Sequence, residues 1–153
     1  MAGLDRLTAL AGEWRAAYQL RGDPAFETDS PTSAVIVPML GGRFVRIDYT
    51  WVESDEQQEG SIVVGHEPDS GVVTAAWMDT WHNHDRMMIC TGSRTADGGV
   101  DVFGTYPGYP AGSPDWGWRT RIEPRSDGWT MTMFNVTPGG EESLAVNAEY
   151  TRA

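Results

Sequence analysis

The residues best suited to chemistry lie in one short segment, Trp77-Met-Asp-Thr-Trp-His82. In an extended strand, side chains alternate between two faces, so Trp77, Asp79 and Trp81 share one face and His82 lies on the other. A carboxylate between two indole rings is unusual on a solvent-facing strand, and a few polar groups among apolar ones are typical of small-molecule sites. If this face points inward, Asp79 is a polar anchor for a ligand or an arginine. If it points outward, the tryptophans cover a neighbouring loop.

The histidines of the same segment suggest a metal site, because imidazole binds zinc, copper and iron and His82 and His84 are two residues apart. A polar turn explains His82-Asn-His-Asp85 equally well, and the spacing fixes no third and fourth ligand. We therefore predict no metal and no cofactor, and we keep His82 as a candidate ligand contact.

Two residues at the ends of apolar faces are further candidate contacts. Tyr18 shares one face of the first expected strand with Trp14 and could present its hydroxyl to a cavity. Asn135 ends a face that carries Met131 and Met133, and flexible methionines suit either an adaptable lining or a filled core. This alternation predicts that the methionine-bearing face points inward.

Arg119 follows two tryptophans in the segment Asp115-Trp-Gly-Trp-Arg119 and has two alternative orientations. Inside a barrel it needs a partner such as Asp79, Asp48 or a ligand anion, because an unpaired buried charge is costly. Outside, it is an ordinary surface charge. We keep Arg119 as a candidate ligand contact with both orientations open.

Composition excludes several classes of partner and chemistry. The 153 residues suit a single domain, residues 1–153, and 22 acidic against 11 basic residues give a net charge of −11. This charge repels nucleic acid and anionic membrane surfaces. All basic residues other than histidine are arginine, which excludes lysine-based catalysis, and the single Cys90 lies in an apolar run that favours a buried, inert thiol.

The first residues lack the basic and apolar regions of a signal peptide, and no window approaches the length of a membrane-spanning helix, so we expect a cytoplasmic protein. The sequence does not fix the oligomeric state, and a homodimer is one alternative.

Glycine and proline recur between short stretches rich in β-branched and aromatic residues, which is typical of consecutive antiparallel strands. Leu4, Leu7 and Leu10 predict a short N-terminal helix. The expected strands span 13–21, 33–39, 43–53, 59–66, 72–81, 86–95, 99–106, 117–123, 129–136 and 143–152.

An open sheet of ten strands would leave two exposed edges, and closure removes them, so we predict an all-β, up-and-down antiparallel barrel of the lipocalin type. The long segments 22–32 and 107–116 are candidates for the mouth of this barrel.

Gly12-Glu-Trp14 at the first strand, with Arg152 on the last strand, resembles the structural signature of the calycins, which comprise lipocalins, fatty-acid-binding proteins and nitrobindins. The resemblance implies that Trp14 plugs one end of the barrel under the arginine. An ordered set of motifs is similar to an uncharacterised bacterial family, a domain of unknown function that spans nearly the whole chain. These motifs are Leu10-Ala-Gly-Glu-Trp14, Leu40-Gly-Gly-Arg-Phe-Val-Arg-Ile-Asp-Tyr49, Trp77-Met-Asp-Thr-Trp-His82, Pro114-Asp-Trp-Gly-Trp-Arg119 and Met133-Phe-Asn-Val-Thr-Pro138.

Three functions are compatible with these patterns. The first is binding of a small hydrophobic or aromatic molecule in the barrel, with Trp77, Asp79 and Trp81 among the contacts. The second is a cofactor-free isomerase or cyclase that uses Asp79 or His82 as general base. The third is a filled barrel that serves as a scaffold. A nitrobindin-like haem site is less favoured, because the nitrobindins ligate iron through a histidine near the C-terminus and residues 143–153 contain none.

Overall fold

The computed structural model describes residues 3–153, which form one short α-helix, one 3-10 turn and ten β-strands. The helical elements are α1 (Asp5–Thr8) and η1 (Leu40–Gly42). The strands are β1 (Gly12–Leu20), β2 (Thr28–Met39), β3 (Phe44–Glu53), β4 (Glu56–His66), β5 (Val73–Asp79), β6 (Met88–Arg94), β7 (Val100–Tyr106), β8 (Trp116–Pro124), β9 (Gly128–Val136) and β10 (Glu142–Arg152).

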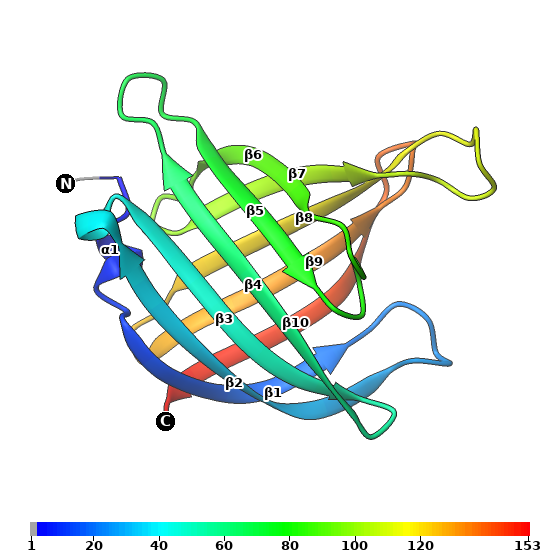
Figure 1. Cartoon of the computed structure of the whole chain (residues 1–153), viewed down its shortest axis with the longest axis horizontal. Helices are drawn as coiled ribbons and strands as arrows, with labels where there is room; N and C mark the ends of the chain where they lie inside the picture. The colour runs from blue at the N-terminus through cyan, green and yellow to red at the C-terminus, as the bar shows by residue number, and fades with distance from the viewer. Residues whose placement is uncertain (1–2) are drawn as a thin grey trace.

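The ten strands close into a single barrel in which every sequential pair is antiparallel and β1 pairs with β10. The predicted up-and-down barrel with a short N-terminal helix is therefore confirmed. Closure pairs both edge strands, which an open sheet would expose. Figure 1 shows the strands slanting around the barrel, with both chain termini and α1 at one end.

Alternation of side chains builds the barrel interior. In β3, Val45, Ile47, Tyr49 and Trp51 are buried, whereas the residues between them are more exposed. The same period in β9 buries Trp129, Met131 and Met133, as the sequence predicts. Such a two-residue period puts one face of each strand into a common core.

One end of the barrel, the closed end, is sealed by α1 and by stacked aromatic side chains. Leu7 is fully buried, and the Trp14 indole nitrogen donates to the carbonyl of Leu10 at 2.8 Å. Trp129 meets Trp14 edge-on at 6.4 Å between centroids and stacks on Tyr150 at 4.1 Å. These rings fill the barrel at this end.

Gly12 and Arg152 complete the closed end. The Arg152 guanidinium carbon lies 4.0 Å from the centre of the Trp14 ring, and its Nη1 donates to the carbonyl of Ala11 at 2.9 Å. Gly12 has a φ of +125°, and a Cβ there would lie 2.6 Å from the Arg152 Nη1 atom. Glycine is therefore needed both for the backbone conformation and for the approach of the arginine.

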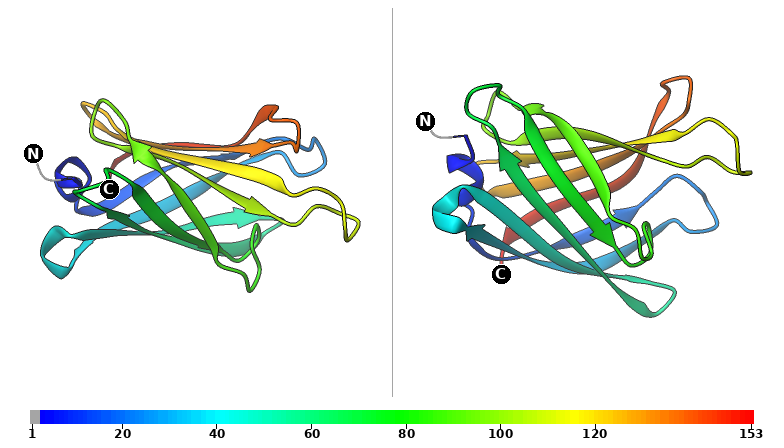
Figure 2. Two further views of the ribbon diagram at one scale, coloured as in Figure 1. Left: turned by 90° about the horizontal axis from the view of Figure 1, so that it is seen from above. Right: turned by 45° about the horizontal axis from the view of Figure 1, so that its top comes forward.

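The opposite, open end is formed by the connections 21–27, 54–55, 80–87, 107–115 and 137–141, which all emerge from the same rim. The two views of Figure 2 show these connections projecting away from the termini. Both segments predicted as the mouth therefore lie at this end. The first is shorter than expected, because β2 begins at Thr28 and pairs with the whole length of β1.

The predicted strand 72–81 is also shorter in the structure. β5 ends at Asp79, and residues 80–85 form a turn in which the backbone N–H of Asn83 donates to the backbone carbonyl of Asp79 at 2.9 Å. This turn redirects the chain at the point where the candidate residues lie. It therefore changes the face on which His82 is found.

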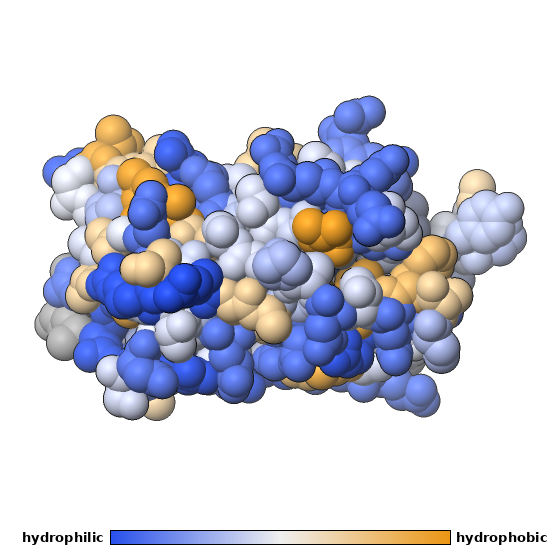
Figure 3. Space-filling view, turned by 90° about the horizontal axis from the view of Figure 1, so that it is seen from below, coloured by the Kyte–Doolittle hydropathy of each residue, from blue (hydrophilic) through white to orange (hydrophobic). Residues whose placement is uncertain are grey.

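The outer wall carries ion pairs, such as Arg46 with Asp48 at 2.9 Å and Arg21 with Asp29 at 2.7 Å. Figure 3 shows one side of this wall, where hydrophobic residues form separate spots among hydrophilic ones. Among the described helices, none is long and apolar enough to cross a membrane.

Candidate functional site

Asp79 occupies the last position of β5 and points into the barrel with 2% of its surface exposed. Its Oδ2 accepts hydrogen bonds from the Tyr49 hydroxyl at 2.7 Å and from the Trp51 indole nitrogen at 3.2 Å. Its Oδ1 accepts the backbone N–H groups of Trp81 and His82, each at 2.9 Å. The carboxylate therefore anchors two strands and the turn that follows β5.

These contacts decide the ionisation of Asp79. Burial alone would raise the pKa of this carboxyl, but the hydrogen bonds and charge offered by His82, together with the Tyr49 hydroxyl, outweigh burial and lower it. Asp79 is therefore held as a carboxylate. With four donors already in place, it has little capacity left to accept a proton from a ligand.

The imidazole of His82 lies inside the open end and not on the opposite face that strand alternation predicts. The turn after Asp79 swings it inward, so that its Nδ1 lies 3.2 Å from Asp79 Oδ1 and only 8% of its side chain is exposed. The prediction failed because alternation ends where the strand ends. The Nδ1 atom is within ion-pair distance of Asp79 but makes no hydrogen bond within the described chain.

Tyr49 links Asp79 to Trp77. Its hydroxyl donates to Asp79 and accepts from the Trp77 indole nitrogen at 2.9 Å. Burial and the nearby Asp79 charge raise the pKa of Tyr49 well above its usual value. The neutral hydroxyl therefore serves as a relay of hydrogen bonds between the two strands.

Tyr18 lies below this network and stacks on Trp51, with centroids 4.4 Å apart and planes at 15°. It is fully buried, and within the described chain its hydroxyl has no hydrogen-bond partner. Burial and the charge of Asp79 raise its pKa well above the usual value. Tyr18 thus points inward as predicted, but it forms the floor beneath the open end.

Two pockets open at this end on either side of the turn after β5. The first, here called the Tyr106 pocket, has a volume of about 830 Å³ and lies between the 80–87 connection and β7. The second, the Phe26 pocket, has a volume of about 640 Å³ and lies between the 21–27 and 137–141 connections. Trp81, His82 and Trp118 line both pockets, so these three side chains form their shared wall.

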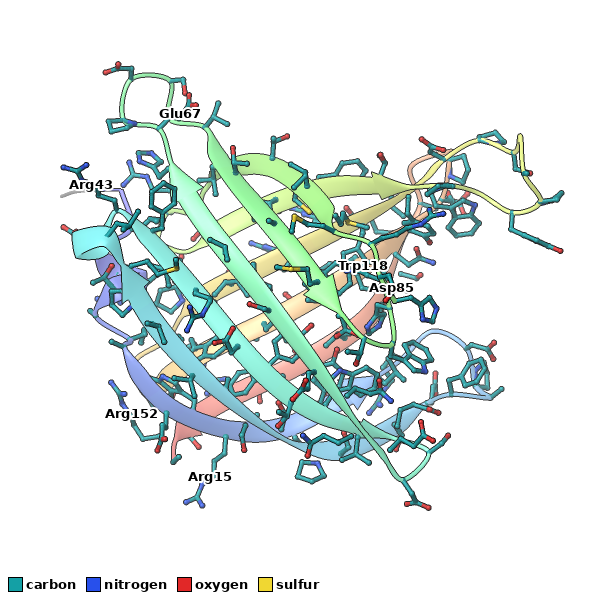
Figure 4. The ribbon with its side chains drawn as sticks, viewed as in Figure 1. Arg15, Arg43, Glu67, Asp85, Trp118 and Arg152 are labelled. Atoms are coloured by element: carbon teal, nitrogen blue, oxygen red, sulfur yellow. The ribbon has the colours of Figure 1, made fainter. Side chains whose placement is uncertain are left out.

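Trp118 connects this shared wall to the buried aromatic residues beneath it. Its ring stacks on Trp77 at 5.1 Å between centroids, and His82 lies 5.2 Å from it. Trp118 is 7% exposed, and its indole nitrogen is buried with no hydrogen-bond partner in the described chain. Figure 4 places Trp118 near Asp85, which lines the Tyr106 pocket with it.

Most of the predicted contacts meet at the open end. Trp77 is buried under the Tyr106 pocket, and Trp81 packs edge-on against Trp51 at 5.7 Å. Asn135 lines the Phe26 pocket, and its side-chain oxygen accepts from the hydroxyl of Tyr106. The structure therefore brings these predicted residues together at one end of the barrel, around His82 and Trp118.

Arg119 is not part of this cluster. It lies on the outer face of β8, where its guanidinium pairs with Asp101 and, at 3.1 Å, with Glu142. Of the two orientations left open by the sequence, the outward one is observed. Its hydrogen bonds to Asp101 raise the pKa of Arg119 further above its usual range, so the group is a permanent surface cation.

Several side chains of the site were not predicted as contacts. Tyr49, Trp51 and Trp118 are inward-facing aromatics, and Tyr106 and Phe26 come from the two sides of the open end. The spacing Tyr49-Thr-Trp51 repeats that of Trp116-Gly-Trp118 in β8, and it is the signal that could have identified the inward-facing aromatics of β3 and β8.

A third hollow, of about 490 Å³, lies on the outer wall of β2 to β5. It is lined mainly by outward residues such as Ser33, Asp48 and Ser61, and Asp48 is already bonded to Ser61 at 2.7 Å. Among residues 3–153, no group of three His, Cys, Asp or Glu side chains could hold a metal ion. The aromatic open end therefore remains the best candidate site.

The fold and the site together define a closed ten-stranded antiparallel barrel with one sealed end and one aromatic open end. The chain belongs to a family described as proteins of unknown function, DUF1579, whose model matches residues 4–152. Comparison with curated proteins gives no match.

Proposed function

We propose that the protein binds a small, planar, largely apolar molecule at the open end of the barrel. The observation that carries the proposal is the shared wall of Trp81, His82 and Trp118, because aromatic side chains from different elements meet there between two pockets. Ligand sites are typically hollows of several hundred Å³ with apolar walls and a few polar groups.

We propose that the unpartnered indole nitrogen of Trp118, which is covered by protein atoms in this structure, becomes the polar contact when a ligand displaces the side chains around it. A buried donor without an acceptor is unfavourable by about 1–3 kcal/mol, and a ligand acceptor recovers only part of that amount because it gives up its own bond to water. The preferred ligand is therefore a flat ring system that carries a hydrogen-bond acceptor such as a carbonyl or ether oxygen.

Two neutral probes of similar shape test this proposal. Coumarin carries a carbonyl acceptor, and naphthalene has none. We expect calorimetric titration to show tighter binding of coumarin, by about three- to tenfold, which is the usual contribution of one hydrogen bond. The variant Trp118→Phe keeps an aromatic ring and loses the N–H, so it should remove this preference and leave naphthalene binding nearly unchanged.

Tyr109→Leu provides the control, because Tyr109 is a 94% exposed aromatic residue at the same end and lines neither pocket. It should bind coumarin as the parent protein does. Absence of binding of both probes to the folded parent protein would contradict the proposal and favour the scaffold alternative.

We infer a second candidate function from the contact between Asp79 and His82. Asp79 orients the imidazole at 3.2 Å, and the ring faces both pockets, so His82 Nε2 could take a proton from one carbon of a bound molecule and return it to another. The protein would then be a cofactor-free isomerase or cyclase, with His82 as the base and Asp79 as a positioning residue.

This second function is tested with the molecule itself. Native mass spectrometry of freshly purified protein identifies a retained adduct, and NMR of that compound after incubation with the protein detects conversion. His82→Gln should abolish conversion and retain binding. An adduct that emerges unchanged after long incubation would exclude catalysis on that compound.

A further inference from the structure

We propose that the Phe26 pocket selects organic cations, such as aromatic ammonium compounds, over neutral and anionic molecules of the same shape. This inference rests on the proposed binding function and adds the charge of the ligand. It follows from which charged side chains around the pocket are in ion pairs and which are not.

The acidic residues of the Phe26 pocket are Asp23, Glu141 and Glu142, which come from the two connections that flank it. Glu142 is paired with Arg119 on the outer wall at 3.1 Å. Asp23 accepts a hydrogen bond from the backbone N–H of Ala25 at 2.9 Å, and this bond leaves its charge in place. Neither Asp23 nor Glu141 has an ion-pair partner within the described chain. Two uncompensated carboxylates therefore face the same opening.

The single arginine among the described residues that line this pocket, Arg21, is already occupied. Its Nη2 pairs with Asp29 at 2.7 Å, and its Nη1 donates to the carbonyls of Leu20 and Thr28 at 2.9 and 3.2 Å. A carboxylate or phosphate ligand would have to displace these contacts. An anionic ligand therefore has no unpaired arginine to bind among the described residues of the pocket, and the carboxylates of Asp23 and Glu141 repel it.

The aromatic walls favour a positive charge as well. Phe26 lies edge-on to Trp81 with centroids 5.7 Å apart, and Trp116 and Trp118 line the opposite side. The faces of these rings carry partial negative charge and attract ammonium groups, most strongly in the case of tryptophan. Aromatic faces beside uncompensated carboxylates are the combination that recognises organic cations.

Three indoles with the same ethyl arm test the inference. Tryptamine carries an ammonium group, tryptophol a hydroxyl and indolepropionate a carboxylate. We expect calorimetric titration at low salt to rank tryptamine above tryptophol by about three- to tenfold, since each exposed charge contributes about 0.2–1 kcal/mol and a cation–π contact adds to it. Indolepropionate should bind most weakly, and added sodium chloride should reduce both the preference for tryptamine and the discrimination against indolepropionate, while tryptophol binding changes little.

The variant Asp23→Asn with Glu141→Gln removes both uncompensated charges and keeps the shape of the side chains. It should bring tryptamine affinity close to that of tryptophol, with only the cation–π contribution of the aromatic walls remaining, while tryptophol binding stays unchanged. A matched control is Glu67→Gln with Asp69→Asn, which alters the net charge equally in the exposed connection 67–72 at the closed end. This control should retain the full tryptamine preference.

The outcomes separate the two proposals. Equal binding of all three indoles, or tightest binding of indolepropionate, would overturn the charge inference and leave the binding function standing. Loss of the tryptamine preference in the closed-end control as well would also overturn it, because the effect would then arise from net charge alone. Failure of all three indoles and of coumarin to bind would overturn the binding function itself.

Discussion

The carboxylate of Asp79 lies 3.2 Å from the imidazole of His82 because β5 ends at Asp79 and the following turn folds back over the open end. The same carboxylate accepts the backbone amides of Trp81 and His82. One buried acid therefore shapes the turn that carries two residues of the shared wall. The pockets and the stability of the barrel depend on the same interaction.

Asp79→Asn should lower the free energy of unfolding by about 2–4 kcal/mol, as loss of a buried, hydrogen-bonded charge typically does. The amide nitrogen of asparagine cannot accept from Trp51, whose indole donates to Oδ2 in the parent protein. Urea denaturation followed by tryptophan fluorescence measures the difference. A loss below about 0.5 kcal/mol would contradict the anchoring role of Asp79.

The difference between the parent protein and Asp79→Asn should also depend on pH. Because the folded protein lowers the pKa of Asp79 below its ordinary value of 3.8, the stabilisation is complete above that value and is lost as the pH falls through the lowered pKa. The two unfolding curves should therefore stay a constant distance apart at neutral and mildly acidic pH and converge in stronger acid. Convergence of the two curves already at neutral pH would mean that folding raises the pKa of Asp79, which is opposite in sign to the predicted shift.

Two buried tyrosines that stack on each other, Tyr49 and Tyr18, should respond differently to loss of the hydroxyl. Tyr49→Phe removes the donor to Asp79 and the acceptor of Trp77, so it should cost about 1–3 kcal/mol of unfolding free energy. Tyr18→Phe removes a hydroxyl without a partner in the described chain, so stability should be unchanged or slightly higher. Thermal denaturation compares the two, and an equal loss in both variants would contradict this hydrogen-bond assignment.

Gly12→Ala should lower the free energy of unfolding by about 2–3 kcal/mol, because residue 12 has a φ of +125° and the new Cβ displaces Arg152 from Trp14. Gly71→Ala is the matched control, since its φ is +77° and nothing lies within 4 Å, so only the backbone strain of about 1 kcal/mol remains. In an Arg152→Ala background, part of the extra cost at Gly12 should disappear. Equal costs at both glycines in chemical denaturation would show that Arg152 plays no part.

Cys90 should be unreactive in the folded protein. It is 1% exposed, and burial raises the pKa of its thiol to about 11, so the thiolate is scarce at pH 8. A disulfide reagent should label it slowly in buffer and rapidly in denaturant. Rapid labelling of the native protein would contradict the buried position.

The barrel could be predicted from the sequence because its cause is local and repeated. Alternation in segments such as Val45–Trp51, interrupted by glycine-rich turns, gives the strand count, and closure follows from the need to pair both edges. Pairing of the first part of β2 with β1 was missed, since Pro31 and the polar residues around it conceal the strand start at Thr28.

The candidate site was harder to predict because it depends on where strands end. Alternation placed His82 on the face opposite Asp79, but one hydrogen-bonded turn after Asp79 brings it to the same side. Arg119 could be assigned to neither face, because a bulky cation pairs equally well outside with Asp101 or inside with a buried acid. Trp118 joins the site through contacts with Trp77 of β5 and His82 of the β5–β6 turn, which no local pattern encodes.

The most direct test of the binding site uses the seven tryptophan indole N–H signals in a proton–nitrogen correlation spectrum during titration with coumarin. Trp81 and Trp118 line the pockets at the open end, whereas Trp14 and Trp129 stack at the closed end and serve as internal controls. We expect the Trp118 and Trp81 signals to move with saturation while those of Trp14 and Trp129 stay in place. Shifts confined to Trp14 and Trp129, or no shift at any indole, would contradict a ligand site at the open end.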